Sequence, residues 1–116
     1  MNAQFLAHSF YALIMSWPVA PPEPVVIDAA TLFGLCTDYD RVADTAACLG
    51  FVKGIANVLA SGEAVHGRKA CLVETAKDEE LVAIVRAYLS DAGERGGDPA
   101  ATLVAAALAD AYPCKR

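Results

Sequence analysis

The 116-residue chain has little charge and few aromatic side chains, and it lacks any basic cluster. Charged residues make up 20% of the sequence and aromatic residues 8%, against 56% hydrophobic residues. A chain this apolar can bury enough surface to fold as one domain, so intrinsic disorder is excluded. Its 14 acidic residues outnumber nine basic ones, and the formal net charge is -5. This balance argues against a nucleic-acid or anionic-lipid partner.

Sequence signatures of catalysis and metal binding are also missing. The chain has no glycine-rich phosphate loop, no GxSxG turn, no pair of histidines at metal-ligand spacing and no CxxC pair. We therefore expect no catalytic residues, no metal site and no cofactor, and we expect that the protein is not an enzyme. No uninterrupted apolar run reaches the ~20 residues of a membrane-spanning helix, so no membrane insertion of the mature chain is expected.

The first 24 residues differ from the rest of the chain. Residues 5–15 are an apolar stretch interrupted by His8 and Ser9, and proline-rich residues 18–24 follow. The stretch resembles the middle of a secretory signal, although no basic residue precedes it and proline follows Val19-Ala20. An ordinary amphipathic helix is the alternative. We expect residues 1–24 to be a signal-like segment with a proline-rich linker, and residues 25–116 to be a folded domain.

The folded part predicts four helices and no strand. Apolar residues recur there at spacings of three and four, without period-two alternation, and Ala, Val and Leu supply most of them. The first expected helix covers residues 29–35 with Asp28 as N-cap, and the second covers about 41–61 and ends at Gly62. The third covers about 75–93, with a capping box at Thr75 to Asp78 and a stop at Gly93. The fourth covers 99–113 with Asp98 as N-cap. The predicted fold class is a small all-α four-helix bundle.

Two further patterns concern how these helices pack. Gly50 and Gly54 lie four residues apart in the second helix, and each costs roughly 1 kcal/mol relative to alanine. Such a pair favours close approach of another backbone, either within one subunit or between two subunits. The short link at residues 93–98 predicts that the third and fourth helices are antiparallel neighbours.

The four cysteines, Cys36, Cys48, Cys71 and Cys114, indicate two disulfides and an oxidising compartment. Three pairings are possible. Antiparallel third and fourth helices would bring Cys71 and Cys114 together, which leaves Cys36 with Cys48. A weaker interpretation makes Cys48 a thiol nucleophile with His66 as its base. A bridged cysteine and a solvent-exposed loop histidine are the simpler interpretation.

Four separated blocks together resemble the Rap/Tai immunity protein family. They are CLGFVKGIANVL at residues 48–59, CL at 71–72, LVAIVRAYL at 81–89 and DPAATLVAAALADAYPC at 98–114. The resemblance covers about residues 30–114. It implies an exported, disulfide-stabilised helical protein of the bacterial periplasm. It also implies a homodimer that protects its cell by blocking the active-site cleft of a peptidoglycan amidase toxin of the type VI secretion system.

If the resemblance holds, the partner is a cognate amidase effector and the contacts come from exposed loops. The expected contact surfaces are the loop at residues 62–70 and the turn at residues 93–97. Their polar side chains are Glu63, His66, Arg68, Glu94 and Arg95. A periplasmic chaperone-like or adaptor protein with another partner is the alternative function.

Overall fold

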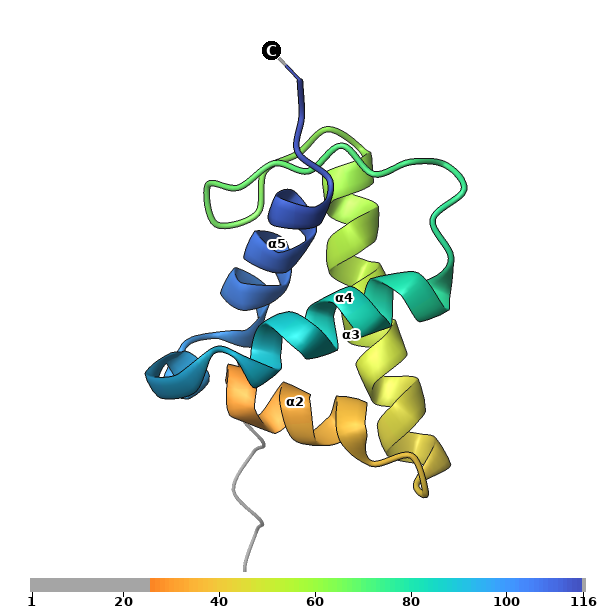
Figure 1. The fold of residues 1–116 in the computed structure, drawn as a ribbon, viewed down its shortest axis with the longest axis vertical. Helices are drawn as coiled ribbons and strands as arrows, with labels where there is room; N and C mark the ends of the chain where they lie inside the picture. Colours follow the sequence, from red (N-terminus) through yellow and green to blue (C-terminus); the bar gives the residue numbers. More distant parts are fainter. Residues whose placement is uncertain (1–25, 116) are drawn as a thin grey trace, which may run out of the picture.

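The computed structural model describes residues 26–115, in which α-helices surround the carboxyl-terminal helix (Figure 1). The predicted signal-like segment and its linker at residues 1–24 lie outside the described residues. The four α-helices are α2 (Ala29–Thr37), α3 (Val42–Ala60), α4 (Asp78–Ser90) and α5 (Ala100–Ala111), and a 3₁₀ helix, η1 (Gly93–Gly97), joins α4 to α5. The part of the chain described here contains two isolated β-bridges and no strand. The all-α prediction is confirmed.

Helix α5 is the most deeply buried element, and α2, α3 and α4 each contact it. Every residue from 103 to 109 is buried. Alanine at four of these positions lets neighbouring helices approach α5 on several sides, while Leu103 and Leu108 fill the larger spaces. Each surrounding helix also contributes large, fully buried side chains, among them Leu32, Val52, Leu59 and Val85.

The start of α2 is capped as the sequence predicts. The backbone N–H of Thr31 donates a hydrogen bond to Asp28 Oδ1 at 2.8 Å. Hydrogen bonds from the Thr31 side chain and then from its backbone lower the pKa of the Asp28 carboxyl below its usual value. The charged cap also lies at the positive end of the helix dipole, so both effects stabilise the first turn of α2.

The predicted cap of α5 is wrong by one residue. Pro99 is the N-cap, in an extended conformation and without a side-chain cap, and the helix begins at Ala100. The reason is backbone pairing with the entry to α2. Ala29 N–H donates to the carbonyl of Asp98, and Ala100 N–H donates to the carbonyl of Ile27, both at 2.9 Å. These bonds hold residues 98 and 99 extended instead of helical.

The predicted limits of α4 are also wrong. The helix begins at Asp78 after Lys77, and no side chain caps it, because Thr75 belongs to a turn in which Ala76 N–H donates to the carbonyl of Val73 at 3.0 Å. It ends at Ser90, before the predicted stop. Helices α4 and α5 are neighbours as expected. In Figure 1, α5 begins near the carboxyl-terminal end of α4 and rises away from it, inclined to its axis.

Helix α3 packs one face into the domain and leaves another open. Cys48, Val52, Ala56 and Leu59 are its buried residues. A Cβ atom at Gly50 or Gly54 would meet no atom within 4 Å, so tight packing of these glycines inside one subunit is ruled out. By length and composition alone α3 could span a membrane. Its buried face nevertheless belongs to the domain core, as in a core helix of a globular protein.

Candidate binding surface

Two disulfides fix the ends of the helices. Cys36–Cys48 joins α2 to α3, and Cys71–Cys114 joins the α3–α4 loop to the residues after α5, each with a Cα–Cα distance of 5.0 Å. These are the pairs favoured from the sequence. All four cysteines of the chain lie in the described part and none is free. The interpretation of Cys48 as a catalytic thiol is therefore wrong, because its sulfur is bonded.

The loop at residues 62–70 contains a tight β-turn at its tip. Val65 N–H donates to the carbonyl of Arg68 at 2.9 Å, and Arg68 N–H donates to the carbonyl of Val65 at 3.0 Å. The two central residues, His66 and Gly67, both have positive φ angles, 49° and 76°. Positive φ at both central positions is the signature of a type I′ turn, the commonest two-residue hairpin connection. We call residues 62–70 the hairpin loop.

Both ends of the hairpin loop are anchored. At its start, Gly62 has a φ of +92°, and its N–H donates to the carbonyl of Leu59 at 3.0 Å, which closes the end of α3. At its end, Ala70 is buried, and Cys71 N–H donates to the carbonyl of Tyr112 at 2.8 Å beside the disulfide. In Figure 1 the loop projects beside the carboxyl-terminal end of α5.

A third anchor lies in the middle of the loop. Arg68 Nη2 donates to Asp110 Oδ1 on α5 at 2.5 Å. Arg68 thus braces the loop, whereas Glu63 and His66 are exposed on it. Asp110 was missed in the sequence analysis. A carboxylate in the last turn of a helix opposes the helix dipole, and this unfavourable position is the signal that it has a partner.

The other two predicted contact residues lie elsewhere. Glu94 and Arg95 belong to η1, which precedes α5, whereas the hairpin loop lies beside the other end of that helix. The 12 residues of α5 separate the two groups by about 18 Å. Arg95 lies 5.4 Å from the ring centre of Tyr88. The hydrogen bond with the Tyr88 hydroxyl raises the pKa of Arg95 above its usual value.

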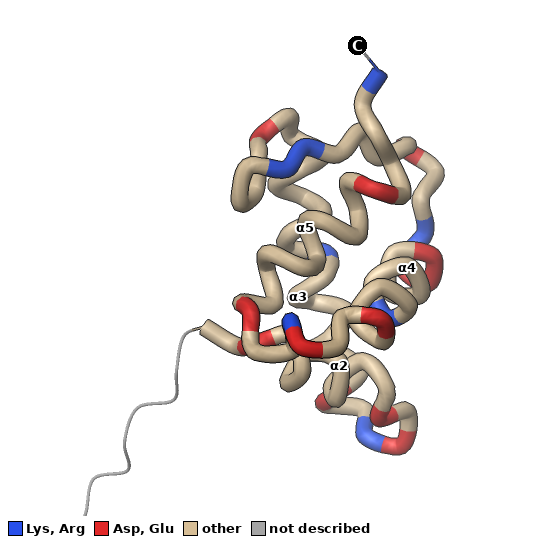
Figure 2. Tube along the Cα trace, turned by 60° about the vertical axis from the view of Figure 1, so that its left-hand side comes forward, with Lys and Arg blue, Asp and Glu red and all other residues tan. Residues whose placement is uncertain are grey.

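The charges of the domain form no large basic face. Figure 2 shows acidic and basic positions spread over loops and helix ends, with basic residues of the hairpin loop next to acidic ones. Among residues 26–115, no group of three or more His, Cys, Asp or Glu side chains is arranged to hold a metal ion.

The family model of Rap1a immunity proteins matches residues 28–114, from the cap of α2 to the last cysteine. This chain belongs to the Rap1a immunity protein family. No curated protein and no solved structure gives a significant match. The matched region includes both disulfides and the hairpin loop. Membership in the family implies that this Rap1a immunity protein neutralises a toxin effector by binding it, and that its role is not catalytic. It also favours immunity over the chaperone-like alternative.

Proposed function

We propose that this immunity protein neutralises a peptidoglycan amidase effector of the type VI secretion system by placing its hairpin loop in the active-site cleft. The observation that carries the proposal is the anchored type I′ turn between Val65 and Arg68. A two-residue turn is narrow enough to enter a cleft. Because both of its cross-turn hydrogen bonds are made internally, fewer backbone polar groups are left unpaired when it enters.

The anchoring also favours tight binding. A flexible loop loses conformational freedom on association, at roughly 0.5–1.5 kcal/mol for each side chain that becomes ordered. The disulfide at Cys71, the Arg68–Asp110 ion pair and the closed end of α3 hold the loop before the toxin arrives. Its tip presents His66, and Glu63 lies on the ascending side. The net charge of -5 accelerates encounter with a basic partner.

The remaining proposed contacts come from η1. Glu94 is exposed there, while the guanidinium of Arg95 rests on Tyr88. In this proposal Glu63, His66, Glu94 and Arg95 touch the toxin, and Arg68 acts by holding the turn. An interface of ordinary size, about 800 Å² on each partner, is roughly 30 Å across and can include both groups.

We propose that the protein acts in the periplasm as a homodimer. The two disulfides favour an oxidising compartment, and peptidoglycan amidases act there. The open face of α3 suits a second copy. Val42 is 83% exposed and Val58 is 42% exposed, and the bare backbone at Gly50 and Gly54 allows a second helix to approach closely. Sedimentation of the purified protein gives the oligomeric state directly.

A growth-protection assay tests the proposed target. Cells export a peptidoglycan amidase toxin to the periplasm with the wild-type protein, with a variant whose residues 63–69 are replaced by a Gly-Ser linker, or with no immunity protein. We expect protection by the wild type only. The matched control replaces Glu74 and Lys77 in the α3–α4 loop with serine and should protect fully. Failure of the wild type against every amidase tested contradicts the amidase target, and protection by the linker variant contradicts the role of the hairpin loop.

A further inference from the structure

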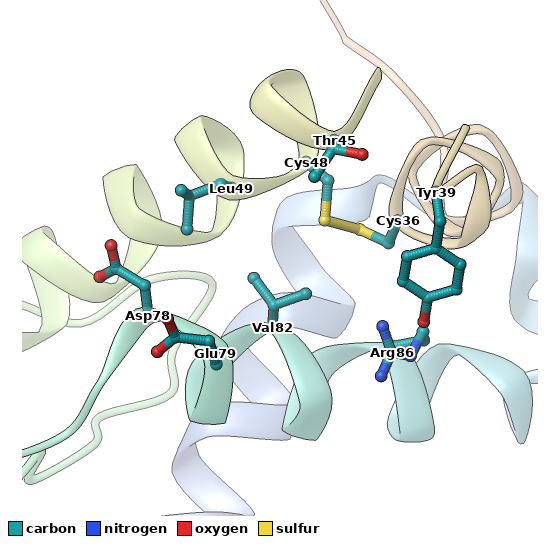
Figure 3. A pocket seen from close by; sticks show the side chains of 9 residues that line it. All are labelled: Cys36, Tyr39, Thr45, Cys48, Leu49, Asp78, Glu79, Val82 and Arg86. Carbon is teal, nitrogen blue, oxygen red and sulfur yellow. A yellow bond between two sulfur atoms is a disulfide. The ribbon is translucent and has the colours of Figure 1, made fainter. Parts of the chain in front are cut away.

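A pocket of about 320 Å³ lies between the α2–α3 junction and α4 (Figure 3). The Cys36–Cys48 disulfide and Leu49 form its wall on α2 and α3, and Val82 of α4 points toward the disulfide between them. These groups give the middle of the pocket an apolar surface. Such a surface suits methylene groups rather than a bare ion.

The two ends of the pocket differ in character. Asp78 and Glu79, in the first turn of α4, lie at one end in Figure 3. Tyr39 and Arg86 lie at the other, with the guanidinium carbon of Arg86 5.3 Å from the centre of the Tyr39 ring. Tyr39 is 68% exposed. The pocket is therefore apolar in the middle, acidic at one end, and both aromatic and basic at the other.

The cations next to the pocket are already engaged, whereas one carboxylate is not. Lys53 Nζ lies 3.5 Å from Asp78 Oδ2. Arg86 stacks on Tyr39. Glu79 is exposed and forms no ion pair within residues 26–115. The positive end of the α4 dipole, roughly half a charge, offsets only part of the acidic first turn.

From this arrangement we propose that the pocket receives a lysine or arginine side chain of the amidase toxin, a second anchor that rests on the proposed function. The methylene groups of that side chain pack between Val82 and Leu49, and its cation pairs with Glu79. Long basic side chains bind in this way because their stems are apolar and only their ends are charged. The pocket complements a basic partner, as the net charge of -5 does for the whole chain.

Helix α3 connects the pocket to the hairpin loop, because Leu49 lines the pocket and the end of the same helix leads into the loop. From Leu49 to the end of α3 the helix rises by about 17 Å at 1.5 Å per residue. This separation is shorter than the roughly 30 Å width of an ordinary interface. In this proposal, a toxin held by the turn also supplies the basic side chain.

Charge reversal at the pocket tests the proposal. The probe is the catalytically inactive amidase against which the wild-type protein protects cells, and its affinity is measured by titration calorimetry. Glu79→Lys is expected to weaken binding at least tenfold. The matched control is Glu80→Lys, which makes the same charge change one residue later and does not line the pocket; it should weaken binding less than threefold. Equal effects of the two variants, or none, overturn the pocket proposal.

Filling the pocket tests the apolar part. Val82→Trp should also weaken binding at least tenfold, whereas Ala83→Trp on the exposed side of α4 should not. Circular dichroism shows whether each variant folds. If Val82→Trp does not fold, a charge exchange between the two proteins takes its place. A toxin variant in which one lysine or arginine is changed to glutamate should restore binding to the Glu79→Lys immunity protein. Failure of every such toxin variant overturns the proposal.

The results separate the two proposals. If the wild-type protein binds no amidase, the proposed function falls, and the pocket proposal falls with it. If the wild type binds and protects while Glu79→Lys and Val82→Trp bind equally well, only the pocket proposal falls.

Discussion

Arg68 and Asp110 are 42 residues apart in the sequence, yet their ion pair, 2.5 Å from Nη2 to Oδ1, ties the hairpin loop to the last turn of α5. Both side chains are largely exposed, at 45% and 59%. Water screens such a pair, so its contribution to the stability of the whole domain is small. We expect its main effect to be on the order of the loop before binding.

Removing this pair should weaken binding more than folding. We expect Asp110→Asn to change the free energy of unfolding by less than about 1 kcal/mol, since exposed pairs contribute 0–1 kcal/mol. Toxin affinity should fall several-fold, and amide hydrogen exchange at residues 63–69 should become faster. The exchanged pair, Arg68→Asp with Asp110→Arg, should recover part of the affinity. Unchanged exchange in Asp110→Asn would show that the pair does not order the loop.

Replacing Gly67 with alanine should destabilise the protein. Its φ of 76° is costly for a residue with a Cβ atom, so Gly67→Ala is expected to lower the free energy of unfolding by about 1–2 kcal/mol. Gly97→Ala is the matched control, because Gly97 is not among the glycines with positive φ and a Cβ there meets nothing within 4 Å. Urea denaturation gives both values. A similar change for the two variants would argue against the type I′ turn.

The two disulfides should differ in their resistance to reduction. Cys71 and Cys114 are exposed, whereas Cys36 and Cys48 are 5% and 2% exposed. Mild reductant followed by alkylation and mass spectrometry should therefore label Cys71 and Cys114 first. Opening that bond frees a loop of 43 residues and costs about 4 kcal/mol in the chain-entropy model, so the second bond should become reducible afterwards. Labelling of Cys36 and Cys48 first would contradict their burial.

The Asp28 cap should make stability depend on pH in the acid range. Its pKa is lowered in the folded protein, so the unfolded chain binds the proton more tightly. The stabilisation by its charge is therefore complete above the unfolded pKa, near 4, and is lost as the pH falls through the folded pKa. The melting temperature of Asp28→Ala should lie below that of the wild type at pH 7, and the difference should shrink below pH 4. A difference that stays constant down to pH 2 would exclude a charged cap.

Sequence patterns within a few residues predicted the helix ends that depend on contacts between neighbouring residues. The cap at Asp28 and the end of α3 at Gly62 require only neighbouring residues, and both are where the sequence places them. The starts of α4 and α5 were misplaced. At α5, the backbone of Asp98 pairs with Ala29, which lies 69 positions earlier and leaves no trace in a local pattern.

The pairing of Cys71 with Cys114 depends on the path of a loop as well as on the helices. Cys71 was paired with Cys114 on the expectation that α4 and α5 are antiparallel. In the structure, the α3–α4 loop itself passes the end of α5, where Cys71 N–H donates to the carbonyl of Tyr112. The candidate contact residues are predicted from the expected exposure of a loop and a turn and from their polar side chains. No sequence pattern could show that Arg68 is held by Asp110 or that η1 lies beyond the other end of α5.

The hairpin loop begins at the closed end of α3 and finishes beside a crosslinked cysteine, so both of its ends are fixed to the framework of the domain. The exposed residues of a segment with fixed ends can be replaced without moving the points at which it is attached. Its residues can diversify, or be redesigned against another toxin, while the alanine-rich centre of the domain stays unchanged.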